Sequence, residues 1–290
     1  MQPKHLALVL LVMVLYGSAY PVGKIGTLDA PPLFLSSMRV LCVFLFFLPF
    51  FKFRLPPKQL ILPLIGFAGS MGVCTYAFMY YALSFTSLVA PIIIGAQLAI
   101  PFGLILSLIF LKEKISLFKW ILIFLSFAGI VVIAYDPNFI DDQLAIIFCI
   151  LMSFFYAMAN MMARYLKEID TSVLNGWCNF IAFFPLIVAS YFIDGNPINI
   201  ISNLESSTFI VILHASLIVS VIGHAGMFYL YRFYPVATVL PFYSLFPIFG
   251  IILTFLMFKE VLTVQQFLGG FMVIGSVYLI HQINKKEVAI

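Results

Sequence analysis

The chain has 290 residues, of which 64% are hydrophobic and only 9% are charged, and its formal net charge is +4. A soluble domain carries about 25% charged residues, so this composition excludes a soluble enzyme or binding domain. The apolar runs are continuous rather than alternating, which excludes a transmembrane β-barrel. The sequence therefore predicts an all-α integral membrane protein.

Ten apolar segments are long enough to cross a bilayer, because about 30 Å of hydrocarbon requires about 20 residues of helix. The first segment could instead be a signal peptide cleaved near Gly17-Ser18-Ala19. We favour a retained span, since its removal would break the internal repeat described below. The predicted spans are 5–23, 32–51, 60–82, 88–111, 116–135, 142–165, 172–192, 207–231, 236–258 and 263–283.

The basic residues are divided unequally between the two sides of the membrane. With a cytoplasmic N-terminus, 12 of the 15 Lys and Arg residues fall in segments predicted to be inside. Lys24 and Lys259 fall outside, and Arg39 falls within a span. This asymmetry follows the positive-inside rule, so both termini are expected in the cytoplasm.

One segment of the chain occurs twice. Residues 102–114 read FGLILSLIFLKEK and residues 249–261 read FGIILTFLMFKEV, at a constant offset of 147. Five spans separate the copies, so they must cross the membrane in opposite directions. We therefore expect two inverted five-helix repeats, at 1–136 and 141–285. Such repeats place a substrate site near the midplane between two halves that alternate in access.

Prolines and glycines mark special positions in these spans. Pro101 and Pro247 lie within spans four and nine, where each removes a backbone hydrogen bond and favours a kink. Each of these prolines could be a hinge, or it could be one of the prolines that are common in membrane helices. Gly269, Gly270 and Gly275 in span ten are typical of close helix packing, within one chain or in a homodimer.

Span six carries a polar stripe. Ser153, Tyr156 and Asn160 recur at i, i+3 and i+7, so they share one helical face, which continues to Arg164. Polar side chains are costly in lipid, and such a face should turn toward other helices or a watery cavity. Interhelical hydrogen bonds are the alternative to a substrate path.

Arg39 and His224 are the ionisable side chains of most interest within spans. Arg39 lies seven residues after Pro32, about 10 Å along its helix. It could meet an anionic group of a substrate, or extend to the headgroups. Ser220 and His224 share one face of span eight, where the histidine could bind a carboxylate, exchange a proton or serve as a neutral core residue.

Further hydroxyl and amide groups could line the same path. Tyr hydroxyls suit a small amphipathic, zwitterionic solute, and Gln97 in the middle of span four can both donate and accept a hydrogen bond. The remaining candidates for substrate contact are Tyr16, Tyr20, Tyr76, Tyr80, Gln97, Tyr243 and Ser244.

The sequence offers little for other chemistries. No Asp or Glu lies in the middle of a predicted span, and no phosphate-binding loop, HExxH or GxSxG motif occurs. The four cysteines are too dispersed to suggest a disulfide framework or a metal site. We expect no cofactor, no metal and no nucleic-acid partner. An intramembrane enzyme is the rival hypothesis, and Cys178 and His224 would be its nearest candidates.

The order of these motifs resembles the EamA-type branch of the drug/metabolite transporter superfamily. The first half carries Tyr16-Gly17, Lys24, Pro31-Pro32-Leu33, Arg39, Gln97 and Lys112-Glu113-Lys114; the second carries Tyr156-Ala157, Asn160, Arg164, Pro241, Pro247, Lys259-Glu260 and Gln266-Phe267-Leu268-Gly269. The resemblance implies a non-enzymatic secondary transporter of the inner (plasma) membrane. Relatives often export amino acids or cysteine metabolites, and some take up larger metabolites such as S-adenosylmethionine. Family members commonly have Trp where Tyr16 and Tyr156 stand, which alters the aromatic wall.

Overall fold

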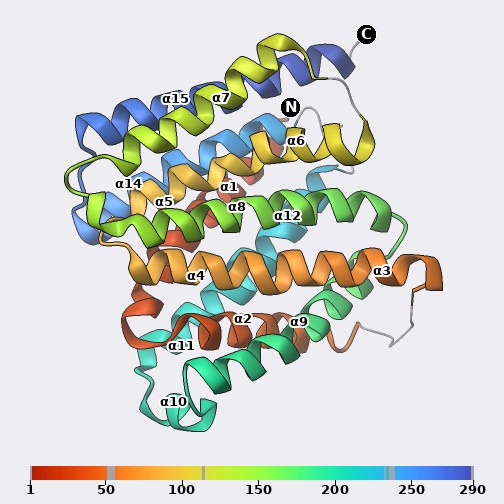
Figure 1. The fold of residues 1–290 in the computed structure, drawn as a ribbon. Coiled ribbons are helices and arrows are strands. Elements are labelled where there is room, and N and C mark those ends of the chain that lie inside the picture. The colour runs from red at the N-terminus through yellow and green to blue at the C-terminus, as the bar shows by residue number, and fades with distance from the viewer. Residues whose placement is uncertain (1, 51–55, 113–114, 232, 235–238, 289–290) are drawn as a thin grey trace.

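The structure is a computed structural model that describes residues 2–50, 56–112, 115–231, 233–234 and 239–288. Within these ranges every regular element is a helix, which confirms the predicted all-helical class. Figure 1 shows the long helices running side by side across the molecule.

The first half of the chain forms α1 (Pro3–Asp29), α2 (Pro32–Phe47), α3 (Lys58–Phe67), α4 (Tyr76–Phe85), α5 (Val89–Gly95), α6 (Ala99–Leu111) and α7 (Leu117–Ala134). The π-helical segment η1 (Ala68–Thr75) joins α3 to α4 in one rod, and the 3₁₀ segment η2 (Ala96–Leu98) joins α5 to α6.

The second half begins with the 3₁₀ turn η3 (Ile140–Asp142). It continues through α8 (Gln143–Ala163), η4 (Arg164–Leu166), α9 (Thr171–Ile193), α10 (Pro197–Asn203), α11 (Ser206–Leu213), the π-helical η5 (His214–Gly223), α12 (His224–Tyr231), the 3₁₀ segment η6 (Leu240–Leu245), α14 (Phe246–Phe258) and α15 (Val264–Val288).

The two halves share their irregularities as well as their helices. A π-helical segment interrupts the third long helix of each half, at η1 and η5, and a 3₁₀ segment precedes α6 and α14. Lys112 and Lys259 end those two helices in the left-handed conformation, with φ of 55° and 59°. Related local sequences thus give the same backbone geometry twice.

Pro101 and Pro247 lie where these 3₁₀ segments change into α-helix. Each falls in the first turn of its helix, α6 or α14. In each case the α-helix continues directly from the 3₁₀ segment, so the missing N–H leaves a carbonyl of the preceding turn without its usual donor. Their role as hinges stays a prediction, now tied to a change of helix type.

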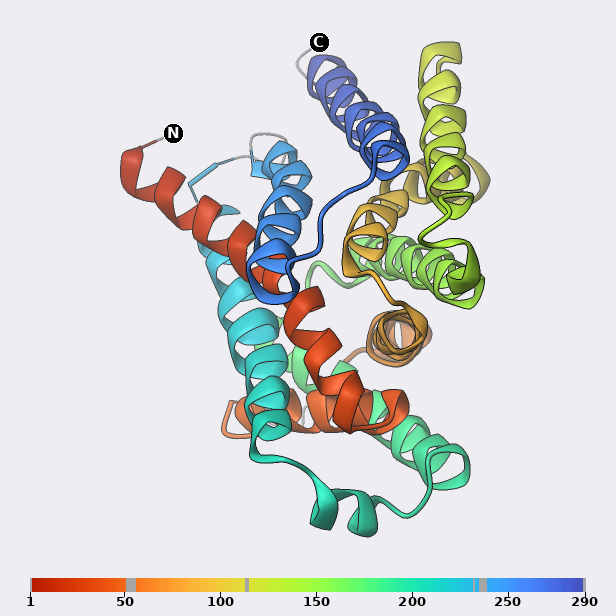
Figure 2. The same cartoon turned by 90° about the vertical axis from the view of Figure 1, so that its left-hand side faces the viewer.

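Helix pairing joins the halves. The outer pairs are α2 with α9 and α7 with α15, while α1 packs on α14 and η5, and α8 packs on α6, α4 and η1. Figures 1 and 2 show α7 beside α15 at one side of the bundle and α2 near α9 at the opposite side. Each pair contains one member from each half, so the centre of the bundle lies between the repeats.

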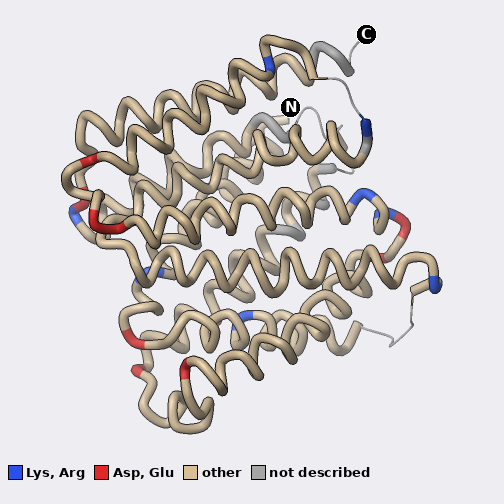
Figure 3. Tube along the Cα trace, in the orientation of Figure 1, with Lys and Arg blue, Asp and Glu red and all other residues tan. Residues whose placement is uncertain are grey.

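Length and surface character suit a bilayer. Eight helices in the described part are long and apolar enough to cross a membrane, and two shorter apolar helices, 32–47 and 242–258, lie at the predicted second and ninth spans. Large apolar side chains such as Leu117 and Phe192 are 78% and 79% exposed, as expected of surfaces that face lipid. The charged residues gather at the two ends of the bundle (Figure 3).

Candidate functional site

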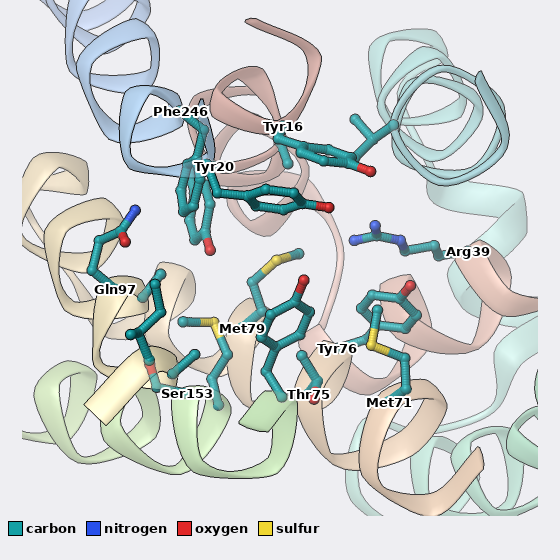
Figure 4. Close-up of a pocket in the computed structure, with 18 residues that line it drawn as sticks. Tyr16, Tyr20, Arg39, Met71, Thr75, Tyr76, Met79, Gln97, Ser153 and Phe246 are labelled. Carbon is teal, nitrogen blue, oxygen red and sulfur yellow. The ribbon is translucent and has the colours of Figure 1, made fainter. Parts of the chain in front are cut away.

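A cavity of about 140 Å³ lies in the middle of the bundle, between the two halves. Figure 4 shows the side chains that surround it. Both halves of the chain contribute lining residues. The lining residues are Tyr16, Ala19, Tyr20, Arg39, Met71, Thr75, Tyr76, Met79, Ala96, Gln97, Ala99, Ile100, Met152, Ser153, Tyr156, Val219, Tyr243 and Phe246.

Arg39 supplies the positive charge of this cavity. Its side chain is only 3% exposed, and its Nη2 and Nε donate to Ser220 Oγ at 3.0 and 3.3 Å. Its Cζ lies 3.9 Å from the centre of the Tyr76 ring, a cation–π distance. Nη1 has no hydrogen-bond partner among the described residues. Figure 4 shows the guanidinium directed toward the Tyr20 hydroxyl across the cavity.

Ser220 positions this arginine rather than lining the cavity. Its hydroxyl donates to the Ala215 carbonyl at 2.9 Å, and its oxygen accepts the two bonds from Arg39. Ser220 and Ala215 both lie in the π-helical segment η5. The predicted polar face of span eight therefore acts on the cavity through Arg39.

Gln97 lies on the opposite wall, on the 3₁₀ segment η2. It is 2% exposed, and its Nε2 has no hydrogen-bond partner among the described residues. Ser153 on α8 holds the backbone beside it, since its hydroxyl approaches the carbonyls of Gly95 at 3.0 Å and Cys149 at 2.9 Å. A Cβ on Gly95 would lie 2.4 Å from Cys149 Sγ, so only glycine allows this close approach.

Aromatic rings form a third wall. Tyr20 stacks on Phe246 with ring centroids 6.2 Å apart and planes 3° apart, and Tyr16 lies 5.7 Å from Tyr243. Gly223 makes room for Tyr16, because a Cβ there would lie 2.8 Å from its ring. These contacts place rings of both halves against each other at the cavity.

Eight of the thirteen predicted substrate residues line this cavity: Tyr16, Tyr20, Arg39, Tyr76, Gln97, Ser153, Tyr156 and Tyr243. The structure brings them together, and substrate contact by them stays a prediction.

The other predicted residues lie elsewhere. Tyr80 is not a lining residue, although it lies next to Arg39, buried in the core at 1% exposure, and Ser244 lies in the wall of a second cavity. Asn160 is exposed in the last turn of α8, beyond the reach of the cavity, although it shares a helical face with Tyr156. The side chain of His224 lies outside the described residues.

Several lining residues were not predicted from the sequence. Met71, Thr75 and Met79 follow one another at four-residue spacing, a stripe that could have identified one of the walls. The repeat gave a second signal, because Phe246 stands at the same offset of 147 from Ala99, and both line the cavity. Methionine and phenylalanine are common throughout the chain, with 12 Met and 33 Phe, so residue type alone does not mark these residues as part of a cavity wall.

At one end of the bundle, five carboxylates each accept hydrogen bonds from the other half of the chain. We call this the acidic end. Glu260 accepts from the amides of Val89 at 2.8 Å and Ala90 at 2.9 Å, at the N-terminus of α5. The five carboxylates are Asp29 (to Glu205 N and Thr208 Oγ1), Asp136 (to Thr263 Oγ1), Asp142 (to Thr86 and Ser87), Asp194 (to Phe34 N) and Glu260.

Burial raises the pKa of Glu260, and the two amides of α5 and the charge of Lys24 offset part of this effect. Burial similarly raises the pKa of Asp194. A raised carboxyl pKa means that burial of the ionised form costs free energy. That cost is present above the raised pKa and disappears as the pH falls through it, so acid should favour the buried, closed arrangement.

The lining side chains of the cavity can bind a polar solute. It offers a guanidinium donor, an amide, several phenol hydroxyls and aromatic faces, and no carboxylate among its lining residues. The described residues hold no group of three or more His, Cys, Asp or Glu side chains that could bind a metal.

Comparison with known proteins agrees with this geometry. A model described as the EamA-like transporter family matches residues 4–135 and again 143–282. The chain belongs to the EamA-like transporter family. It is therefore a multi-pass inner-membrane transporter and not an enzyme, and its two family matches correspond to the internal repeat.

Individual relatives are distant but cover nearly the full length. The chain is 25% identical to a probable amino-acid metabolite efflux pump of Escherichia coli (strain K12), over 96% of this chain and 95% of that protein. It is 22% identical to a protein of the same description from Salmonella typhimurium, over 94% and 93%. One crystal structure of a protein shares the fold with a TM-score of 0.62, 13% identity and 99% coverage of both chains.

Proposed function

We propose that this EamA-family protein exports an amino acid or a close derivative through the central cavity. The observation that carries the proposal is Arg39, a buried guanidinium with an unpartnered Nη1 in an aromatic cavity between the halves. A buried cation needs an anionic or hydrogen-bonding partner, and a substrate carboxylate would supply one. The two relatives described as amino-acid metabolite efflux pumps support export of this class of solute.

The other walls suit the rest of such a solute. Tyr20 and Tyr76 present aromatic faces and hydroxyls to an ammonium group, and Gln97 can donate from its unpartnered Nε2 or accept at its oxygen. Met79 and Phe246 offer apolar contact to a side chain.

Cavity size favours a small substrate over the alternative of S-adenosylmethionine uptake or exchange. The volume of about 140 Å³ is below the range of about 300–1,000 Å³ usual for drug-sized ligands. A solute as large as S-adenosylmethionine would require the halves to separate further.

We further propose transport by alternating access between two inverted five-helix repeats, 1–136 and 141–285, with ten spans and both termini cytoplasmic. The acidic end then faces outward, and its five carboxylate contacts between halves support a state closed to the outside. Opening would exchange these contacts for water, and Pro101 and Pro247 are the proposed hinges.

The test is transport into inside-out membrane vesicles that contain the wild-type protein, with labelled amino acids, cysteine precursors and S-adenosylmethionine offered in turn. Arg39→Gln should lose the charged hydrogen bonds to the substrate. Such bonds are worth about 1.5–3 kcal/mol, so the apparent affinity should fall about 10- to 150-fold. Arg164→Gln is the matched control, because Arg164 is an exposed arginine outside the cavity.

Uptake of an amino acid that depends on Arg39 and not on Arg164 would support the proposal. Equal affinity in wild type and Arg39→Gln would refute the role of the guanidinium. Transport of S-adenosylmethionine alone would favour the alternative substrate.

A further inference from the structure

A second and larger cavity lies away from the central one. Its volume is about 630 Å³, compared with about 140 Å³ for the central cavity. It forms a groove between α15 on one side and α14 with η6 on the other. Figure 2 shows α15 between α7 and α14.

The groove opens toward the bilayer. Apolar side chains along it remain largely exposed, among them Ile252 at 49%, Phe267 at 62% and Phe271 at 71%. Helices α14 and α15 belong to membrane-spanning segments, so hydrocarbon rather than water surrounds this surface. An empty apolar groove of this size would forfeit the dispersion contacts of its walls.

The length of the groove along α15 is close to the hydrocarbon thickness of one leaflet. Along α15 the lining runs from Gln266 to Tyr278, which at 1.5 Å per residue is about 18 Å. Half of a hydrocarbon core of about 30 Å is about 15 Å. A single acyl chain of one leaflet therefore covers most of the length of the groove.

One buried polar group lies at the end of the groove nearest the acidic end. Gln266, in the first turn of α15, is 0% exposed and lines the groove. Its Oε1 accepts from Thr263 N at 3.4 Å, while its Nε2 has no hydrogen-bond partner among the described residues. A buried amide donor without an acceptor is costly, and Gln266 lies three residues after Thr263, which bonds to Asp136 at the acidic end.

We propose that this groove is a binding site for one phospholipid. Its acyl chain lies between α14 and α15, and a change of side-chain rotamer at Gln266 turns the buried Nε2 toward the groove, where it donates a hydrogen bond to an ester carbonyl at the acidic end. An apolar, narrow ligand with one acceptor near its end has the chemistry that the groove presents.

The bound lipid supports the wall of the central cavity. Segment η6 borders both spaces, since Phe242 and Leu245 line the groove while Tyr243 and the adjoining Phe246 line the central cavity. An acyl chain in the groove holds η6 from behind and keeps these rings in place.

The test is photo-crosslinking of full-length protein in phospholipid vesicles that contain a phospholipid with a diazirine on its acyl chain. The labelled residues are mapped by digestion and mass spectrometry. We expect label concentrated on groove residues such as Ile252 and Phe271, above the level at Leu11 and Val131, which are 52% and 53% exposed elsewhere on the surface.

Two variants sharpen the test. A Cβ on Gly275 would meet nothing within 4 Å, so Gly275→Trp should fill the groove without displacing its walls and should reduce the groove label to the level of the comparison surface. Gly103→Trp is the matched control, because Gly103 has equally open surroundings and lies outside the groove. Gln266→Leu should also weaken the label.

Label spread evenly over the apolar surface would overturn the proposal, as would an undiminished groove label in Gly275→Trp. Crosslinks through the groove between two copies of the chain would show that a second copy, and not a lipid, occupies it. The wild-type label map decides the question even if a variant fails to insert.

Discussion

A close contact between the backbones of α1 and α14 beside the central cavity predicts that two glycine-to-alanine substitutions will differ in stability. A Cβ on Gly17 of α1 would lie 2.6 Å from the amide nitrogen of Gly250 and 2.7 Å from the carbonyl oxygen of Phe246, both on α14. These are backbone atoms, so no side-chain rotation can relieve the clash. Gly17→Ala must push α1 away from α14.

The magnitude follows from comparison with Gly103, which lies within α6. A Cβ there meets nothing within 4 Å, so Gly103→Ala should only gain helix propensity, worth about 1 kcal/mol. Gly17→Ala has the same gain but adds overpacking, which costs about 1–3 kcal/mol. Gly17→Ala should therefore be less stable than Gly103→Ala by about 1–3 kcal/mol.

The assay is unfolding of both purified variants in the same detergent, with transport measured in vesicles. Separation of α1 from α14 should also disturb the Tyr20–Phe246 stack, so we expect weaker substrate affinity in Gly17→Ala and wild-type affinity in Gly103→Ala. Equal stability of the two variants would refute the reasoning, since it would mean that the α1–α14 crossing is not close-packed.

Three further predictions concern the cavity and the acidic end. Gly223→Ala should move the Tyr16 ring, which a Cβ would approach to 2.8 Å, and should weaken substrate binding measured by thermal shift; unchanged binding would contradict the aromatic wall. Gln97→Ala should weaken substrate binding and Asn160→Ala should not, because Gln97 lines the cavity and Asn160 does not. Equal effects of the two substitutions in the same assay would contradict substrate binding in this cavity. Because burial raises the pKa of Glu260, the closed acidic end should become more stable as the pH falls through that pKa. Glu260→Gln should reduce this dependence to the part due to Asp194, whose pKa burial also raises, in spectroscopic distance measurements across the acidic end. An unaltered pH profile would exclude Glu260 as a source.

The sequence carried the class of the protein and the relation between its halves. Continuous apolar runs without charge are stable in lipid only as helices. Segments 102–114 and 249–261 repeat each other, and one of them lies in each of the two family matches. Lys112 and Lys259 even adopt the same left-handed turn. Such features depend on local sequence and hydropathy, which one chain displays directly.

The tertiary structure decided which polar residues meet. The π-helical segments η1 and η5 shift the phase of their helices, so regular spacing could not show that Ser220 supports Arg39 from behind the cavity. Asn160 shares a face with Tyr156, yet lies near the end of its helix and outside the cavity. The cavity is formed between halves, from helices far apart in sequence, and its position depends on their packing rather than on the periodicity of any one of them.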